Sequence, residues 1–312
     1  YGLAGGRGHS PALRILMERE REIRAFKPET FWVITADVKK DKESFTLTCA
    51  EEPRDRKEVD RILEVGKSGN WKIADVKETK AKRSPKAPFI TSTLQQASST
   101  RLGYSPARTM QLAQKLYEAG HITYMRTDST NLSKQAFGQI KGVVEKTFGP
   151  QYFESRFYGK KSKGAQEAHE AVRPTNLNKT NAGNTDEQKR LYRLIWARTV
   201  ASQMVDAQML RTKVIAQVND GETPDFTVNG QRIIEEGWLK ADPGARGEET
   251  EVPEVKTGDS INLVGMHEEE KQTQPPSRYT EAGLVKELEK RGIGRPSTSV
   301  SYTHLRAHET VV

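Results

Sequence analysis

The chain has 312 residues, with 50 Lys or Arg against 42 Asp or Glu, so its formal charge at pH 7 is +8. Its single cysteine, Cys49, excludes an internal disulfide framework and a cysteine-based zinc site. No run of about 18 apolar residues predicts a membrane span, and no basic and apolar leader opens the chain. We expect an intracellular, cytoplasmic protein of about two to four domains or lobes.

The basic excess lies in one internal segment. Residues 86–205 hold 18 Lys or Arg and 8 Asp or Glu, whereas the rest of the chain holds 32 and 34. Concentrated positive charge is typical of proteins that neutralise phosphates, because the released counterions supply affinity. A solvated lysine-rich surface, such as a loop at 160–164, would give the same composition. The charge count therefore favours an anionic partner without identifying it.

In chain order, the first 85 residues predict one amphipathic helix and then mostly β structure. Lys27-Pro28 ends the helix, and the strands are interrupted by one charged helix that ends before Gly66. The expected elements are a helix at 11–25, strands at 31–38 and 45–49, a helix at 51–63, a strand at 71–76 and a linker at 80–88.

The next segment, 86–205, predicts mostly helices. Ser105 is a typical N-cap, Pro106 suits the first helical position, and Gly120 suits the end of the same helix. A short strand at 122–125 follows at once, and this order in a basic segment is similar to a winged-helix arrangement. The other expected helices are 92–102, 134–148 and 187–206.

After residue 206 the alternating pattern of β strands returns, interrupted by an acidic stretch at 241–258. Because β segments flank the helical segment on both sides, we predict a multidomain α+β fold in which a discontinuous β domain carries an inserted helical domain. The strands expected here are 212–218, 226–234 and 260–266.

Two nucleotide-binding motifs fail on inspection. Gly66-Lys67-Ser68 ends like a P-loop, but Arg61 stands where the first glycine is needed. Gly6-Arg7-Gly8 begins like a dinucleotide fingerprint, but Pro11 stands at the position of the third glycine. The six histidines show no His-x-x-x-His spacing. We expect no ATP site and no metal ligands in this chain.

The stretch Ile-Thr-Tyr-Met-Arg-Thr-Asp-Ser at 122–129 is the best candidate for a reactive site. In extended geometry Tyr124 and Arg126 share a face, so one phosphate could meet both the hydroxyl and the guanidinium. A tyrosine, with a pKa of about 10, needs such a cation to attack phosphorus. His169 and Arg173 form a second cluster if their stretch is helical. Spacing alone leaves a purely structural role open for all four.

Four ordered stretches resemble the type IA DNA topoisomerases, in their bacterial topoisomerase I branch. Met125, where another branch usually has proline, favours this branch, and the resemblance runs from about Ala4 to Thr298. The stretches are Pro-Phe-Ile-Thr-Ser-Thr-Leu-Gln-Gln at 88–96, the tyrosine motif at 122–129, the histidine motif at 165–175, and Tyr-Thr-Glu-Ala at 279–282 with Gly-Ile-Gly-Arg-Pro-Ser-Thr at 292–298.

By this resemblance, Tyr124 attacks a phosphodiester of single-stranded DNA, keeps the 5′ phosphate and releases a 3′ hydroxyl. Arg126 binds the scissile phosphate, and His169 assists beside it. Rejoining needs no ATP, because the phosphotyrosine keeps the bond energy. The implied partner is single-stranded or negatively supercoiled DNA, and the implied enzyme is a nucleoid-associated monomer. Further DNA contacts are implied at Arg7, His9, Ser10, Arg173, Arg295 and Thr298.

The implied fold is a toroidal core, a ring of lobes that opens to pass a DNA strand. In this reading, parts of a DNA-binding lobe lie at 1–30 and 267–298, and the discontinuous β domain lies at 31–85 and 206–266. The helical domain at 86–205, which carries the active-site tyrosine, is inserted into it. The tail at 299–312 does not match the family and suggests a frameshift.

The sequence departs from the family pattern at its start as well. The family's metal-binding domain precedes everything in this chain, so Mg²⁺ is expected to bind outside it and the chain to be a fragment. Where the family reads Ser-Ala-Gly-Arg-Val-Gln-Ser, residues 4–10 read Ala-Gly-Gly-Arg-Gly-His-Ser, so His9 replaces an amide donor. Two alternatives stay open. One is a catalytically incomplete fragment that only binds single-stranded DNA, and the other is a tyrosine recombinase, although the flanking motifs do not suggest a recombinase.

Overall fold

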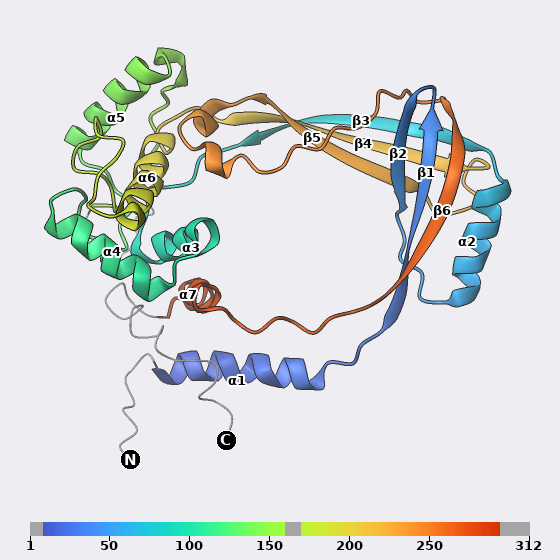
Figure 1. Ribbon diagram of the computed structural model, residues 1–312, viewed down its shortest axis with the longest axis horizontal. Helices are drawn as coiled ribbons and strands as arrows, with labels where there is room; N and C mark the ends of the chain where they lie inside the picture. Colours follow the sequence, from blue (N-terminus) through green and yellow to red (C-terminus); the bar gives the residue numbers. More distant parts are fainter. Residues whose placement is uncertain (1–8, 160–169, 294–312) are drawn as a thin grey trace.

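The computed structural model describes residues 9–159 and 170–293, a mixed α/β structure with a β barrel and a helical lobe (Figure 1). Of the predicted site residues, Arg7, His169, Arg295 and Thr298 lie outside the described residues. His9 and Ser10 are described only as the first residues of a helix.

Six strands from two stretches of the described chain close into one barrel, at the right of Figure 1. All neighbouring strands are antiparallel, and their order around the barrel is β1-β2-β5-β4-β3-β6. The strands are β1 (Thr30–Lys40), β2 (Glu43–Cys49), β3 (Trp71–Arg83), β4 (Ala207–Val218), β5 (Phe226–Glu235) and β6 (Ser260–Gln272).

The barrel interior is filled by alternate strand residues, since successive side chains in a strand point to opposite faces. Trp71 and Phe226 meet edge to face, with 4.8 Å between ring centroids. Helix α2 (Arg56–Ser68) closes one end and accepts a hydrogen bond from the Trp71 indole at the carbonyl of Gly66, 2.8 Å away. A Cβ at Gly66 would lie 2.4 Å from the sulfur of Met266, so a larger residue there would require the end of the Met266 side chain to move.

The strands run further than the sequence pattern predicted. β3 continues past residue 76 to Arg83, which pairs with Ala207 at the start of β4, five residues before the expected strand. These ends form a ribbon that leaves the barrel toward the helical lobe (Figure 1). The β3 strand of this ribbon is largely solvated, whereas Ala207, Met209 and Leu210 of β4 are buried, so the outer part of β3 lacks the apolar alternation from which strands are predicted. β6 likewise ends at Gln272 rather than at residue 266.

In the described residues between β3 and β4, the helical lobe contains four α-helices and one short 3-10 helix. Ser105 caps α4 by accepting a hydrogen bond from the backbone of Arg108, as its position predicts. Leu112 and Leu116 of α4 pack in a core with Leu191 and other residues of α6. The four helices are α3 (Thr91–Leu102), α4 (Pro106–Glu118), α5 (Lys134–Thr147) and α6 (Asp186–Ala201).

Three further predicted elements differ from the structure. α2 begins at Arg56 rather than at residue 51, because Asp55 accepts the capping hydrogen bond from the backbone of Lys57. α6 ends at Ala201, five residues early, because the chain turns there into β4. The expected strand at 122–125 is an irregular segment with one bridge, Ile122 to Pro174. The strand of a winged helix is therefore absent from the described residues.

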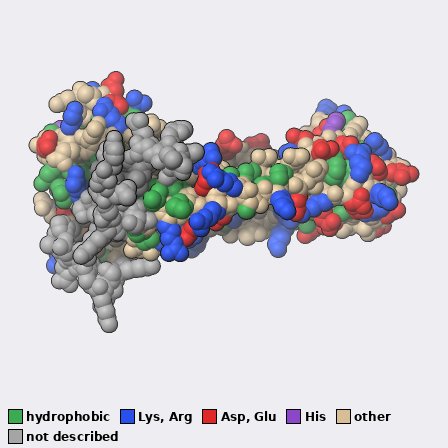
Figure 2. Space-filling view, turned by 90° about the horizontal axis from the view of Figure 1, so that it is seen from below, with side chains coloured by type: hydrophobic (Ala, Val, Ile, Leu, Met, Phe, Trp, Pro, Cys, Tyr) green, Lys and Arg blue, Asp and Glu red, His purple; other side chains and the backbone are tan. Residues whose placement is uncertain are grey.

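Two helices outside the barrel and the lobe pack against each other. Ala12 and Ile15 of α1 (His9–Ala25) share an apolar contact with Leu284 and Leu288 of α7 (Glu281–Lys290). In Figure 1, α1 and the chain leading to α7 run below the ribbon, so barrel and lobe are linked along two paths. Figure 2 shows acidic and basic side chains intermixed on this lower face. None of the helices in the described residues is long and apolar enough to cross a membrane.

Candidate active site around Tyr124

The segment that carries Tyr124 lies between two others that are distant in sequence. The amide of Thr123 donates to the carbonyl of Arg173, and the amide of Thr91 donates to the carbonyl of Thr127, both at 2.9 Å. The amide of Val172 donates to the carbonyl of Phe89 at 2.8 Å. Three irregular stretches of the chain are thus held side by side, and Tyr124 lies between the fixed points.

The hydroxyl of Thr91 holds this segment in place. It donates to the carbonyl of Met125 at 2.8 Å and accepts from the amide of Thr127 at 2.9 Å. Thr91 is 1% exposed, and Met125 and Thr127 are also buried. The sequence stretch 88–96 was recognised without a role for Thr91. The role of Thr91 could not be predicted from the residue itself, because a lone threonine does not reveal which backbone atoms its hydroxyl will contact. Only the resemblance of the stretch to the family marked it.

Burial alternates along the segment even though it is not a sheet strand. Met125 and Thr127 point inward, whereas Arg126 and Asp128 are exposed. Tyr124 is 41% exposed. Tyr124 and Arg126 are therefore both open to solvent, on either side of a buried Met125.

A second tyrosine fixes the orientation of the first. The ring of Tyr117, from α4, meets the ring of Tyr124 edge to face, with centroids 5.3 Å apart and an angle of 66°. Both rings are partly exposed. Edge-to-face pairs of this kind restrict ring position while leaving the hydroxyl free. The sequence does not predict this contact, because Tyr117 lies on a helix and Tyr124 on the irregular segment that follows it.

Arg173 is placed differently from the prediction. Residues 170–175 are extended rather than helical, so the argument from a shared helix face with His169 fails for the described part. The Arg173 guanidinium donates to Glu170 at 2.5 and 3.1 Å and to the carbonyl of Pro174 at 2.9 Å. Its side chain is largely buried, so these bonds hold the strip that flanks Tyr124.

Glu170 links this strip to α5. Its other oxygen accepts from the amide of Ser133, the N-cap of α5, at 2.6 Å. Burial alone would raise the pKa of Glu170, but the hydrogen bonds from Ser133 and Arg173 outweigh it and leave that pKa below its ordinary value. Glu170 is therefore a structural carboxylate that is ionised at neutral pH.

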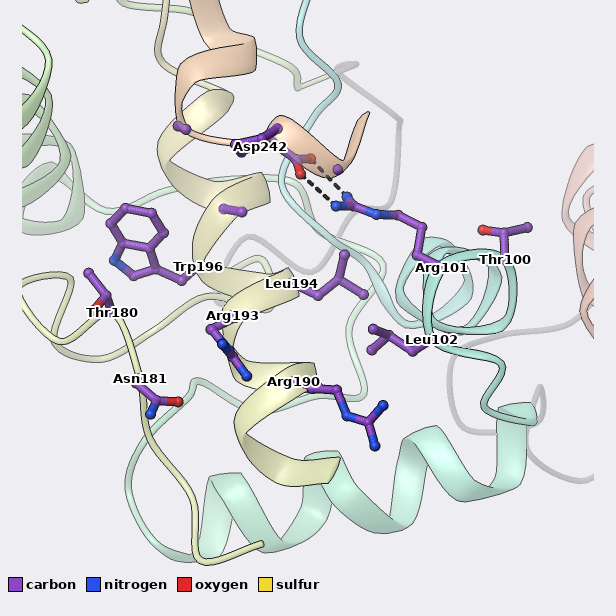
Figure 3. A pocket seen from close by; sticks show the side chains of 14 residues that line it. Thr100, Arg101, Leu102, Thr180, Asn181, Arg190, Arg193, Leu194, Trp196 and Asp242 are labelled. Atoms are coloured by element: carbon purple, nitrogen blue, oxygen red, sulfur yellow. Dashed lines mark hydrogen bonds and ion pairs between the residues drawn. The ribbon is translucent and has the colours of Figure 1, made fainter. Parts of the chain in front are cut away.

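The described residues contain no group of three or more His, Cys, Asp or Glu side chains that could hold a metal ion. A cavity of about 870 Å³ is present, but it lies beside α3 and α6 (Figure 3). Arg190 and Arg193 line it together with Arg101, which donates to both carboxylate oxygens of Asp242 at 2.7 and 2.9 Å. The Tyr124 segment does not line this cavity.

A family model, curated sequences and solved structures all match this chain to DNA topoisomerases. The family model described as DNA topoisomerase matches residues 1–304. The chain is 45% identical to DNA topoisomerase 1 of Vibrio cholerae, and the match covers 96% of this chain and 35% of that protein. It is 40% identical to DNA topoisomerase 1 of Escherichia coli, over 96% of this chain and 36% of that protein.

Among solved structures, the full-length topoisomerase I of Thermotoga maritima superposes with a TM-score of 0.82 at 34% sequence identity. The match covers 98% of this chain and 51% of that one. The chain thus spans about a third of the length of the first two relatives, at 35% and 36%.

Proposed function

This chain belongs to the type IA DNA topoisomerase family, and we propose that it forms the part of the enzyme's catalytic core that cleaves and rejoins single-stranded DNA. The observation that carries the proposal is the exposed pair of Tyr124 and Arg126 on a segment whose alternate residues are buried and hydrogen-bonded. Such a rigid support keeps a nucleophile and a phosphate-binding group in fixed relation.

In the proposed reaction the hydroxyl oxygen of Tyr124 attacks phosphorus of a DNA phosphodiester. The bond from phosphorus to the 3′ oxygen breaks, and the leaving 3′ oxygen takes up a proton as the tyrosine loses its own. Arg126 binds the non-bridging oxygens and stabilises the charge that develops on them. His169 and Arg173 are further candidates for this phosphate environment.

Rejoining is the reverse displacement by the 3′ hydroxyl. The phosphoryl group stays bonded throughout, so the reaction requires no ATP. Mg²⁺ is proposed to be bound by residues outside this chain, since the described ranges 9–159 and 170–293 do not supply a cluster for it. When bound, such an ion neutralises phosphate charge. No step above depends on it.

The proposed partner is single-stranded or negatively supercoiled DNA, bound by a monomer in the cytoplasm. The two links between barrel and lobe are consistent with a toroidal core that opens to pass a strand. Arg7, His9, Ser10, Arg295 and Thr298 are proposed DNA contacts by family resemblance.

A suicide oligonucleotide tests the cleavage step. The chain is incubated with single-stranded DNA carrying a label at either its 3′ or its 5′ end, and covalent adducts are resolved by denaturing electrophoresis. A 5′-phosphotyrosine transfers the 3′ label to protein, and Tyr124→Phe abolishes the transfer. Transfer of the 5′ label would instead favour a recombinase. Non-covalent binding without adduct would favour a DNA-binding fragment.

Relaxation is tested in the full-length parent protein, where the remaining lobes are present. With Mg²⁺ and no ATP, we expect it to relax a negatively supercoiled plasmid. Tyr124→Phe, which retains the ring and removes the nucleophile, serves as the matched control. Relaxation by the phenylalanine variant would refute the assignment of Tyr124.

A further inference from the structure

A second cavity, of about 510 Å³, lies between α3 and α7 and does not include the Tyr124 segment. Gln96 and Thr100 line it from α3, and Gly283 and Lys286 line it from α7. The two helices also contact each other directly, because the Gln96 amide donates to Glu289 at 3.0 Å. Anything bound in this cavity would touch both helices.

The cavity wall carries far more positive than negative charge. Its one carboxylate, Asp242, is 2% exposed and gives both oxygens to Arg101. Among residues 9–159 and 170–293, neither Lys86 nor Lys286 has a carboxylate within 4 Å. The basic side chains that line the cavity are Arg83, Lys86, Arg101, Arg198 and Lys286.

Two of these guanidinium groups are held by uncharged partners. Arg83 donates to the carbonyls of Ala245 and Arg246 at 2.6 and 2.8 Å. Arg198 donates to the carbonyl of Ala87 at 3.4 Å and lies 4.2 Å from the centre of the Phe89 ring. Carbonyls and rings orient a guanidinium but do not neutralise it. Arg83 and Arg198 are thus held in place by uncharged partners, and Asp242 is the one lining carboxylate, among the described residues, that offsets the charge of the five cations.

The cations around the cavity disfavour one another's charged forms. Desolvation lowers the pKa of Lys86, and the nearby Arg198, Arg83 and Lys286 lower it further. Desolvation also lowers the pKa of Arg198 to about 10, which leaves it charged at neutral pH. A bound anion would relieve this repulsion, since an opposite charge favours the protonated form of each cation.

We propose that the cavity between α3 and α7 is a binding site for a phosphate-class anion, either inorganic phosphate or a backbone phosphate of nucleic acid. Guanidinium and ammonium groups that converge from several elements match the charge and the multiple acceptors of such an anion. The inference stands apart from the reaction at Tyr124, because it uses different residues and requires no cleavage.

The proposed site is connected to the active segment through short links. Arg198 contacts Ala87 and Phe89, and Phe89 lies two residues before Thr91, whose hydroxyl holds the backbone around Tyr124. An anion in the cavity would therefore bridge α7 to α3 and stabilise the support of Tyr124 together with it.

Titration of the chain with inorganic phosphate at constant ionic strength tests the proposal by calorimetry. Each charge-assisted hydrogen bond lost should weaken affinity about tenfold. We expect Lys86→Gln with Lys286→Gln to bind about a hundredfold more weakly, and Lys290→Gln, which is on α7 but does not line the cavity, to match wild type. Amide exchange in α7 should slow when phosphate binds to wild type.

Two results would overturn the proposal: no saturable phosphate binding by the wild type, or equal binding by the double variant. Circular dichroism checks that the variants remain folded. A single-stranded pentanucleotide then identifies the source of the phosphate group. If it displaces phosphate from the wild type, the site takes a nucleic-acid backbone, and if it does not, the site takes the free ion. Tyr124→Phe should bind phosphate normally, which separates this test from the cleavage assay.

Discussion

Replacing Thr91 by valine tests whether its hydroxyl holds the Tyr124 segment. Valine keeps the branched shape but leaves the amide of Thr127 without a partner and removes the donor to the carbonyl of Met125. Thr91 and Thr127 are buried, so water does not readily replace these bonds. Leaving a buried polar group unsatisfied costs about 1–3 kcal/mol. For two groups we expect local stability to fall by at least about 2 kcal/mol, or roughly thirtyfold in the opening equilibrium.

Hydrogen exchange followed by mass spectrometry measures this loss in peptides that cover 121–131. The exchange rate of the Thr127 amide should rise roughly thirtyfold, while the exchange of barrel peptides should be unchanged. Thr100→Val is the matched control on the same helix, because the Thr100 hydroxyl bonds only to α3 carbonyls. Its effect should stay within about 0.5 kcal/mol. Equal exchange at Thr127 in Thr91→Val and wild type would refute the role of the hydroxyl.

Three further predictions concern the same site. Tyr117→Leu should lower the free energy of unfolding by about 0.5–1.5 kcal/mol in urea denaturation, whereas Tyr117→Phe should not, because the edge-to-face contact with Tyr124 needs only the ring. The folded-state pKa of Glu170 is depressed below 4.5, so its contribution to stability is present at neutral pH and lost as pH falls through that lower value. Glu170→Gln should be less stable at pH 7 and lose less stability on acidification, and parallel pH profiles would contradict this. Single-stranded DNA affinity should fall linearly with log salt, and Arg126→Gln should reduce the slope by about 0.7 if Arg126 contacts one phosphate.

Helices whose ends are marked by capping residues were predictable from the sequence. α4 is an example, because Ser105 and Pro106 mark its start and its apolar stripe faces the lobe core. The outer part of β3 was underestimated, since none of its residues after Val76 is buried. The closure of the barrel could not be predicted, because strands separated in sequence by the whole helical lobe carry no signal of which edge they will meet.

The proposed pair of Tyr124 and Arg126 rests on a local pattern in the same way. Tyr124 and Arg126 are two residues apart, so any extended backbone places them on one side, whether or not a sheet forms. The supports were not predictable. Thr91 and Arg173 act on the segment from positions more than thirty residues away, and their partners are backbone atoms that every residue possesses.

The charge count describes residues 86–205 as a whole and does not say which of their cations remain available on the folded surface. Much of the positive charge between 86 and 205 is compensated inside the fold, as where Arg156 donates to Asp206 at 2.7 Å. Arg173 is likewise occupied by Glu170. What can attract a phosphate is charge that the fold leaves exposed or poorly compensated. In the described residues Arg126 and the cations of the cavity between α3 and α7 meet this condition, as do exposed side chains such as Lys115, Lys134 and Lys146. If a polyanion bound in proportion to the total charge of the segment, loss of Arg126 and loss of Arg156 would weaken its affinity equally. We expect loss of Arg126 to weaken the affinity more.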